Sequence, residues 1–400
     1  MVEYSTIEPW QVVDENGVVY DLGSLMAYFY ALVDPRKARG KRYHLVTLLA
    51  LVFLAKLSGM DGPSAIADWC QARREALVEL LHLVYPHMPS HHTFRRLFAD
   101  VLDEEAFEQR MREYTAQQHG TSLGPGLLAL DGKKEHGSMA PGESQGEATL
   151  AVYDPEQGQV LAQVAIQPKQ GEIPAGTAAL EQVELTDKVV LADALHTQRK
   201  LCQQVLAAGG DYLLTIKENQ PLTYQAIVSL FAPTAPNRQL LDFQRVCKTN
   251  KGHGRLERRT LTALPLWPGE IDWPGIQQVF RLERKFTFLR QGRVVRVEEA
   301  VHYGLTSLTR PRANADRLLS LKRLYWQIEN GLHYRRDVTF HEDATRMSHP
   351  HATRNLTTVH NTILSLLARL GCHNVAQTRR RLDGNLRLAF SLLISAHPRL

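Results

Sequence analysis

Apolar and polar positions follow three different patterns along the 400-residue chain, and each pattern predicts a different kind of structure. Up to about residue 120, apolar residues recur with a helical period. The most apolar run, LVTLLALVFLAKL at 45–57, is too short to span a bilayer and contains Lys56, so we interpret it as a buried helix. A helical period returns at 65–84, and Ser90 is expected to cap the first of two further short helices. We therefore predict a helical N-terminal domain at 1–120.

The pattern changes after the turn-forming segment TSLGPG at 121–126. Two short apolar runs, LLAL and VVLA, each lead directly into an aspartate, Asp131 and Asp193. Around them we predict strands at 148–154, 159–166 and 211–216 and helices near 173–184 and 197–210. Strands that come first and then alternate with helices predict an α/β fold with a mixed sheet covered on both faces.

Residues 234–310 have the alternation of antiparallel strands, at 259–264, 278–289 and 292–308, and we interpret them as a β-rich insertion into the α/β core. A helix is predicted at 314–336, and two more at 352–370 and 375–395. The predicted organisation thus has four parts: the N-terminal domain at 1–120, the first part of the core at 121–233, the insertion at 234–310, and a last core helix with C-terminal helices at 311–400.

Composition narrows the class of protein. An apolar fraction of 44% and a charged fraction of 22% are those of an ordinary soluble globular protein. The net charge of +5 permits a polyanionic partner without requiring one, but basic clusters at 36–42, 95–98, 251–259 and 377–387 favour DNA. Four widely spaced cysteines argue against a disulfide framework and a zinc knuckle. With no signal-like N-terminus, we expect a cytoplasmic protein that does not enter membranes.

Three carboxylates stand out as candidate chemistry. Asp131 and Asp193 end buried strands, so they are able to converge at one edge of the sheet. Glu329 lies on the helix predicted at 314–336, in a stripe of basic and aromatic residues at three- and four-residue spacing: Lys322, Tyr325, Trp326, His333 and Arg336. Three converging carboxylates repel one another unless a divalent cation neutralises them, and oxygen ligands point to Mg²⁺ or Mn²⁺. Two such ions roughly 3.5–4 Å apart can catalyse phosphoryl transfer.

An ordinary interpretation competes with this one. An aspartate after a strand is often only a turn or cap residue. Glu329 would then be a surface carboxylate paired with Arg336 or Lys322. The spacing of the three acids does not decide between the two interpretations.

Longer motifs carry a family resemblance. The segments LLALDGKKEHGS, VVLADALHTQRK, GGDYLLTIKENQP and YWQIENGLHYRRDVTFHEDATR together resemble the DDE transposases of bacterial insertion sequences, most closely the H-repeat-associated branch. The resemblance extends into the N-terminal region through DPRKARGKRYHLVTLLALVFLAKLSG and MPSHHTFRRLF, so that it covers about positions 25–365. It implies that the N-terminal domain at 1–120 binds DNA.

The resemblance implies an RNase-H-like core that is interrupted by a β-rich insertion before the helix with the glutamate. It assigns Asp131, Asp193 and Glu329 as the catalytic residues that hold two Mg²⁺ or Mn²⁺ ions. Residues expected to contact DNA are Lys133, Lys217, Asn219, Lys322, Tyr325, Trp326, His333 and Arg336. For Lys217 a strand-end charge is an equal alternative, and Tyr325 and Trp326 would either stack on an unpaired base or pack against the sheet. Asp337 and Asp343 would orient Arg or His side chains beside the metals, or instead fix the turn after the helix.

The implied activity is hydrolysis of a phosphodiester at each element end, followed by attack of the 3′-hydroxyl on target DNA. Two ends must be paired, so a homodimer on double-stranded DNA is expected. The alternatives are a catalytically silent, domesticated DNA-binding protein on the same fold and a stand-alone Mg²⁺ nuclease. Departures from the family pattern, namely KQGE at 169–172, KKEH at 133–136 and Tyr325, put full activity in doubt more than the fold.

Overall fold

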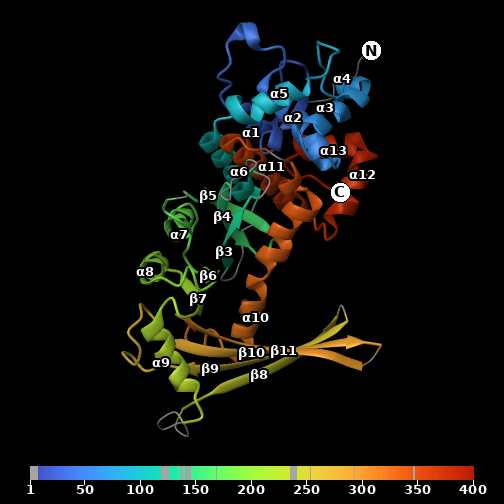
Figure 1. The fold of residues 1–400 in the computed structure, drawn as a ribbon. Helices are drawn as coiled ribbons and strands as arrows, with labels where there is room; N and C mark the ends of the chain where they lie inside the picture. Colours follow the sequence, from blue (N-terminus) through green and yellow to red (C-terminus); the bar gives the residue numbers. More distant parts are fainter. Residues whose placement is uncertain are drawn as a thin grey trace.

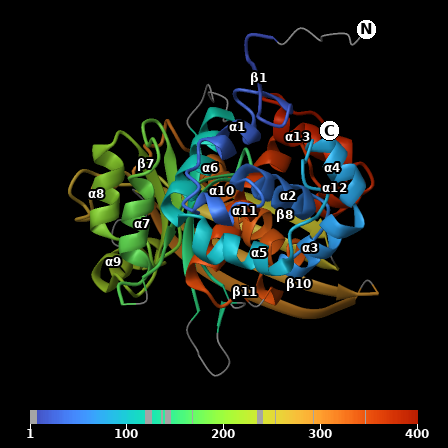
Figure 2. The ribbon, with the colours of Figure 1, turned by 90° about the horizontal axis from the view of Figure 1, so that it is seen from above.

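A mixed sheet of nine strands is the framework of the protein, and helices cover both of its faces (Figures 1 and 2). The structure is a computed structural model, and it describes residues 8–118, 126–135, 138–139, 146–167, 169–234, 241–252, 254–291, 293–345 and 347–400. The break expected at 121–126 lies outside the described residues except for Gly126, and so does His136. The predicted α/β class with a mixed sheet is confirmed.

Five strands form the central part of the sheet, in the spatial order β5-β4-β3-β6-β7. Their bounds are β3 Leu127–Lys134, β4 Ala148–Asp154, β5 Gln159–Ala165, β6 Val189–Ala192 and β7 Asp211–Ile216. Strands β3, β6 and β7 are parallel, whereas β4 is antiparallel to both of its neighbours. Strand β6 stops directly before Asp193, as expected, but β3 continues past Asp131 because its end still pairs with β4.

The strands of the predicted insertion extend this same sheet. They are β8 Gln244–Gly252, β9 Arg255–Pro265, β10 Gln278–Arg290 and β11 Arg293–Thr306. The connection is an antiparallel pairing of β11 with β7, from Tyr303 opposite Ile216 to Thr306 opposite Leu213. Because the sheet is continuous across this junction, the four-part division of the chain stays a prediction.

Side-chain alternation along the strands decides which helix faces which residue. On one face, Leu128 and Leu130 belong to an apolar cluster with α7 (Glu172–Leu180) and α8 (Arg199–Ala207). On the other face, Leu127 and Leu191 belong to a cluster with α10 (Ala315–Tyr325). Asp131 and Asp193 have the parity of this second set, so the alternation turns both toward the side of α10. Helix α9 (Pro221–Phe231) packs against β11, the last strand of the insertion.

N-terminal and C-terminal helices interleave in one helical body with a common apolar core (Figure 1). Its helices are α1 Leu25–Tyr30, α2 Leu45–Leu57, α3 Pro63–Ala72, α4 Arg74–Leu80, α5 His91–Arg96, α6 Glu104–Gln118, α11 Pro350–Arg369, α12 Val375–Asp383 and α13 Leu386–Ile394. Every residue of α2 is buried, which confirms the predicted buried helix. No helix among the described residues has the length and apolar character needed to cross a bilayer.

Two predictions for this helical body are wrong. The segment before α1 contains a short hairpin, β1 Gln11–Val13 and β2 Val19–Asp21, where only helix was expected. The helix predicted at 375–395 is divided into α12 and α13, because the Asn385 side chain accepts a hydrogen bond from the Leu388 N–H and starts a new helix there.

The helix that carries Glu329 is not a regular α-helix. After α10 ends, π-helical segments run over Ile328–His333 and Arg335–Thr339. A π-turn has a longer hydrogen-bond spacing than an α-turn, so the three- and four-residue spacing no longer keeps side chains in one stripe. Glu329 and Trp326 are exposed, whereas Lys322, His333 and Arg336 are buried. The expectation that all of them share one face is therefore wrong.

Candidate active site at the ends of β3 and β6

Asp131 and Asp193 are brought together by strand register. In the parallel pair of β3 and β6, Leu130 lies opposite Ala192, so the two aspartates occupy the next positions on neighbouring strands. Neighbouring strands lie about 4.8 Å apart. Asp193 is held in place by its own turn, since its Oδ1 accepts hydrogen bonds from the N–H groups of Leu195 at 2.9 Å and His196 at 3.4 Å. This contact is the cap role considered above, and it also fixes the position of the carboxylate.

Glu329 reaches the same place from the π-helical segment. One ligand atom each of Asp131, Glu329 and His333 lie within 4.8 Å of one another. The His333 Nε2 is 3.3 Å from the Asp131 Oδ2. Two carboxylates and an imidazole at such distances fit a divalent cation such as Mn²⁺ or Mg²⁺, which prefer oxygen ligands. His333, which we expected to contact DNA, is thus placed as a candidate metal ligand.

Tyr325 lies between the acids and the body of the helix. Its hydroxyl donates a 3.4 Å hydrogen bond to the Asp131 Oδ1. Burial raises the pKa of this phenol, and the charges of Asp131 and Asp193 raise it further. Tyr325 therefore stays protonated. Its hydroxyl contacts the Asp131 carboxylate, where stacking on a nucleobase or packing against the sheet was expected.

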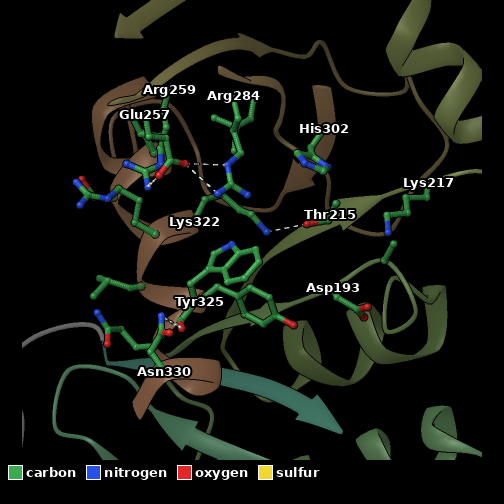
Figure 3. A pocket seen from close by; sticks show the side chains of 18 of the residues that line it. Asp193, Thr215, Lys217, Glu257, Arg259, Arg284, His302, Lys322, Tyr325 and Asn330 are labelled. Carbon is green, nitrogen blue, oxygen red and sulfur yellow. Dashed lines mark hydrogen bonds and ion pairs between the residues drawn. The ribbon is translucent and has the colours of Figure 1, made fainter. Parts of the chain in front are cut away.

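A large basic cavity opens beside Asp193, between α10 and strands β9 to β11 (Figure 3). Its volume is about 710 Å³. Its lining includes six cationic side chains and two carboxylates: Lys217, Arg255, Arg259, Arg284, Lys322 and Arg323 against Asp193 and Glu257. Glu257 is already paired with Arg284 at 2.9 Å, so the excess positive charge is available to an anion.

Lys322 and Trp326 both line this cavity, the first buried and the second exposed. The Lys322 Nζ donates to the Thr215 hydroxyl at 2.7 Å, and burial lowers the pKa of this amine to about 8, although Asp193 opposes the shift. Trp326 is 51% exposed, and the Arg284 guanidinium lies 5.3 Å from its ring centroid. An exposed indole beside a guanidinium is a suitable platform for a base.

Lys217 and Asn219 follow β7 at the same edge. Lys217 is exposed and lines the basic cavity, as a phosphate contact would. The Asn219 amide donates to the Ala194 carbonyl at 2.7 Å, so it supports the loop that holds Asp193.

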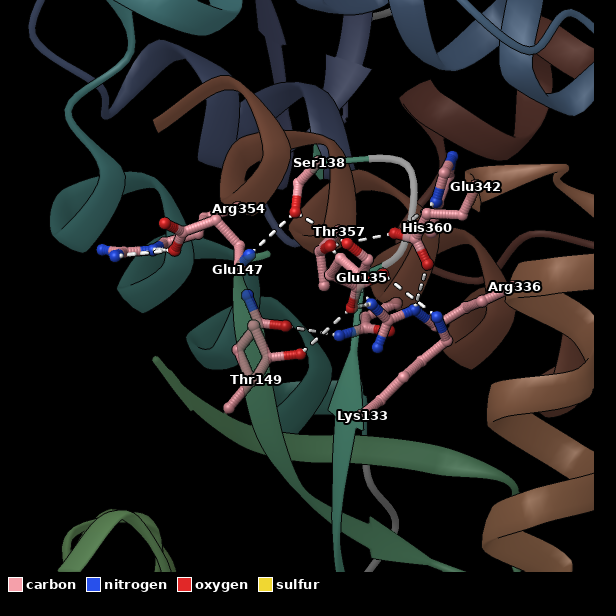
Figure 4. Close-up of polar contacts among 12 residues, drawn as sticks. Lys133, Glu135, Ser138, Glu147, Thr149, Arg336, Glu342, Arg354, Thr357 and His360 are labelled. Carbon is pink, nitrogen blue, oxygen red and sulfur yellow. Dashed lines mark hydrogen bonds and ion pairs between the residues drawn. The ribbon is translucent and has the colours of Figure 1, made fainter. Parts of the chain in front are cut away.

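Arg336 and Lys133 belong to a buried ion-pair cluster and not to a DNA surface (Figure 4). Arg336 is fully buried, and its guanidinium pairs with Glu135 and with Glu342. These two carboxylates raise the pKa of Arg336, and Arg336 in turn holds the pKa of Glu342 well below its usual range. A fully enclosed guanidinium cannot contact a DNA backbone, so the structure corrects this assignment.

The same correction holds for Lys133, which is 7% exposed. Its Nζ lies 3.1 Å from Glu135, 2.8 Å from Asp337 and 3.7 Å from Asp343. Asp337 and Asp343 therefore bind a lysine of β3, close to Asp131, where we expected them either to orient an Arg or His side chain or to fix the turn after the helix.

A second basic cavity lies on the other side of the Glu329 segment, with a volume of about 660 Å³. It is lined by α12 and by the π-helical residues, including Arg335, Arg379 and Arg380. Its carboxylate Asp383 is already bound by Arg73 at 2.8 Å. Asn330, the residue after Glu329, lines both cavities, so the two basic surfaces meet beside the acid centre.

Sequence reasoning gave no role to Glu172 and did not single out His196. Burial raises the pKa of Glu172, and the charges of Asp131 and Asp193 raise it further. His196 is 1% exposed and lies three residues after Asp193 in the chain. Glu172 is the last residue of the motif KQGE, which departs from the family pattern. Its contact with β3 could not be predicted from the sequence, because that contact depends on the fold.

Comparison with known proteins identifies the family of the chain. The family model "Transposase DDE domain" matches residues 124–366, and "DDE_Tnp_1-associated" matches residues 26–115. The first match begins before β3 and ends within α11, so it contains Asp131, Asp193 and Glu329.

Three relatives are similar over most of their own length. An "Uncharacterized protein in dhlA 3'region" of Xanthobacter autotrophicus is 31% identical over 64% of this chain and 87% of its own. "Putative transposase YncI" of Escherichia coli O157:H7 is 26% identical over 86% of this chain and 87% of its own. "H repeat-associated putative transposase YhhI" of Escherichia coli (strain K12) is 22% identical over 87% of this chain and 91% of its own. The family expected from the sequence motifs is confirmed, and the chain belongs to the DDE transposases.

Proposed function

We propose that this chain is the transposase of an insertion sequence and that Asp131, Asp193 and Glu329 are its catalytic carboxylates. Two observations support the proposal: the strand register sets Asp193 next to Asp131, and ligand atoms of Asp131, Glu329 and His333 lie within 4.8 Å of one another, close to two basic cavities. The strand order β5-β4-β3-β6-β7, with β4 alone antiparallel, further supports an RNase-H-like core.

The reaction we infer is hydrolysis of a phosphodiester at each element end, followed by attack of the new 3′-hydroxyl on target DNA. Two Mg²⁺ or Mn²⁺ ions bound by the carboxylates would supply Lewis acidity at the scissile phosphate. The residues of the chain bind and orient the DNA. Lys217 and Arg323 offer exposed cations to the backbone, and Trp326 offers a stacking surface next to the acids.

The partner is double-stranded DNA, both at the element ends and at the target. Because both ends must be held together before strand transfer, we propose a homodimer as the working form. Its place would be the bacterial cytoplasm, consistent with four free cysteines.

The decisive experiment incubates the purified protein with linear DNA that carries its flanking element ends, with and without Mg²⁺. We expect metal-dependent cleavage at the ends by the wild type and a loss of at least 10³-fold in Asp193→Asn, which keeps the size of the side chain. A matched control is Asp187→Asn, an exposed residue of the loop before β6. DNA binding without any metal-dependent cleavage by the wild type would instead identify a catalytically silent DNA-binding protein.

A further inference from the structure

Glu172, the first residue of α7, lies against the strand that carries Asp131. Its carboxyl packs on Gly132, since a Cβ built on Gly132 would be 2.7 Å from the Cδ and the Oε2 of Glu172. Any larger residue at 132 would displace this carboxyl. Gly132, the glycine of the DGK motif, therefore leaves space for the Glu172 carboxyl directly beside the backbone that follows Asp131.

A buried imidazole is directed at the same carboxyl. The His196 Nε2 lies 3.8 Å from the Glu172 Oε2, too far for a hydrogen bond. Neither ring nitrogen of His196 has a hydrogen-bond partner among the described residues, although the side chain is 1% exposed. Buried polar groups are nearly always hydrogen-bonded, so an unpartnered imidazole here indicates that a further polar group or a bound ligand completes the site.

We infer that Glu172 is a fourth carboxylate of the acid centre and that with Asp131 and Asp193 it holds one of the two divalent cations. Glu329 and His333, together with Asp131, hold the other cation. Asp131 is common to both sets, as expected for two cations that lie close together. This inference rests on the function proposed above and adds a ligand that the three-acid assignment lacks.

An ordinary role at the end of a helix does not explain the surroundings of Glu172. A carboxylate at the first turn of a helix is favourable in any protein, because it faces the positive end of the helix dipole. That role alone would be satisfied in solvent. It does not require a glycine on the neighbouring strand or a buried histidine beside the carboxyl.

The test is a titration of the full-length protein with Mn²⁺, in which electron paramagnetic resonance measures the concentration of free Mn²⁺ at each step. Wild type is expected to bind two ions. Glu172→Gln and Gly132→Ala should each lose one of them or bind it at least tenfold more weakly, the first by removing the ligand and the second by displacing it. Glu181→Gln, which changes an exposed carboxylate at the other end of α7, should match wild type. Circular dichroism melts in the absence of Mn²⁺ confirm that each variant is folded.

The outcomes separate this inference from the proposed function. If Asp193→Asn loses an ion whereas Glu172→Gln keeps two ions with wild-type affinity, Glu172 is only a helix-end carboxylate and the inference is overturned. If the wild type binds no Mn²⁺, the proposed metal-dependent function fails as well. A loss shared by Glu172→Gln and Gly132→Ala but absent from Glu181→Gln supports the fourth ligand.

Discussion

At the scale of single residues, burial distinguishes cations that look alike in the sequence. Lys322 and Arg336 both flank Glu329 at helical spacing, and both were expected to contact DNA. Arg336 is enclosed with two carboxylates, whereas Lys322 lines a cavity and donates a hydrogen bond to the Thr215 hydroxyl. The same charge therefore stabilises the fold in one case and remains close to a ligand surface in the other.

Replacement of Arg336 by Met should destabilise the fold. It would leave Glu135 and Glu342 buried without their shared cation, and breaking a buried ion pair costs about 3–5 kcal/mol. Urea unfolding, monitored by circular dichroism, measures this change in the free energy of unfolding. Arg335→Met is the control, because Arg335 is partly exposed and forms no ion pair among the described residues, and it should change the free energy of unfolding by less than about 1 kcal/mol. Unchanged stability with weakened DNA binding in Arg336→Met would restore the DNA-contact assignment.

Lys322 should make stability depend on pH in the alkaline range. Burial lowers its pKa from 10.5 to about 8 in the folded chain, so between these values the unfolded chain binds more protons. The Lys322 contribution to the free energy of unfolding therefore rises as pH increases from 8 to 10.5, by up to about 3 kcal/mol. Lys322→Met removes this contribution, so the difference between wild type and variant should change across that range. Parallel pH profiles would contradict the assignment, and Lys200→Met, at an exposed site, is the control.

At the scale of elements, strong periodicity made most of the fold predictable. The apolar runs before Asp131 and Asp193, the buried helix at 45–57 and three strands of the insertion, β9 to β11, were found from pattern alone, whereas strand β8 was missed. The π-helical register after α10 was not predicted, because the spacing of residues was read on a regular α-helix, whereas this segment packs against residues far away in the sequence, such as Tyr153 beside Gly331. For the same reason the positions of His333, Glu172 and Arg336 could not be read from the spacing of residues along a regular helix.

The contact of Gly331 with Tyr153 should control the position of Glu329. A Cβ on Gly331 would be 2.4 Å from the Tyr153 hydroxyl but 3.3 Å from the ring carbon that bears it. Gly331→Ala would normally favour a helix by about 1 kcal/mol. Here the clash should dominate, displacing the segment and lowering both the cleavage rate and the affinity for Mn²⁺ by at least tenfold.

Removal of the hydroxyl provides a matched rescue. Tyr153→Phe alone should have a small effect, and the double variant Gly331→Ala with Tyr153→Phe should recover most of the Mn²⁺ affinity, because the closest atom is gone. The coupling between the two changes is measured by a double-mutant cycle. Additive effects of the two substitutions would show that this contact does not position Glu329.

At the scale of the whole molecule, the helical body and the active site are parts of one structure. Ile328 and Leu332, on either side of Glu329, belong to the apolar core that also contains α2 and α11. The N-terminal region is therefore packed around the segment that carries Glu329. A truncation that removes the N-terminal helices would expose this core, so the DNA binding predicted for this region is better tested by surface substitutions.

The two basic cavities on either side of Glu329 predict a continuous path for DNA. Lys217 and Arg323 face one cavity, and Arg335 and Arg380 face the other, and none of these four forms an ion pair within the described part of the chain. Each cation that contacts a phosphate contributes about 0.9 to the slope of log K against log salt concentration. We expect Arg323→Ala and Arg380→Ala each to lower the slope for an element-end duplex with flanking DNA by about 1, and the double variant to lower it by about 2. For a duplex that stops at the cleavage site, only one of the two substitutions should still matter, because the DNA then fills a single cavity. If Arg380→Ala leaves the slope unchanged on both duplexes, DNA does not cross the Glu329 segment.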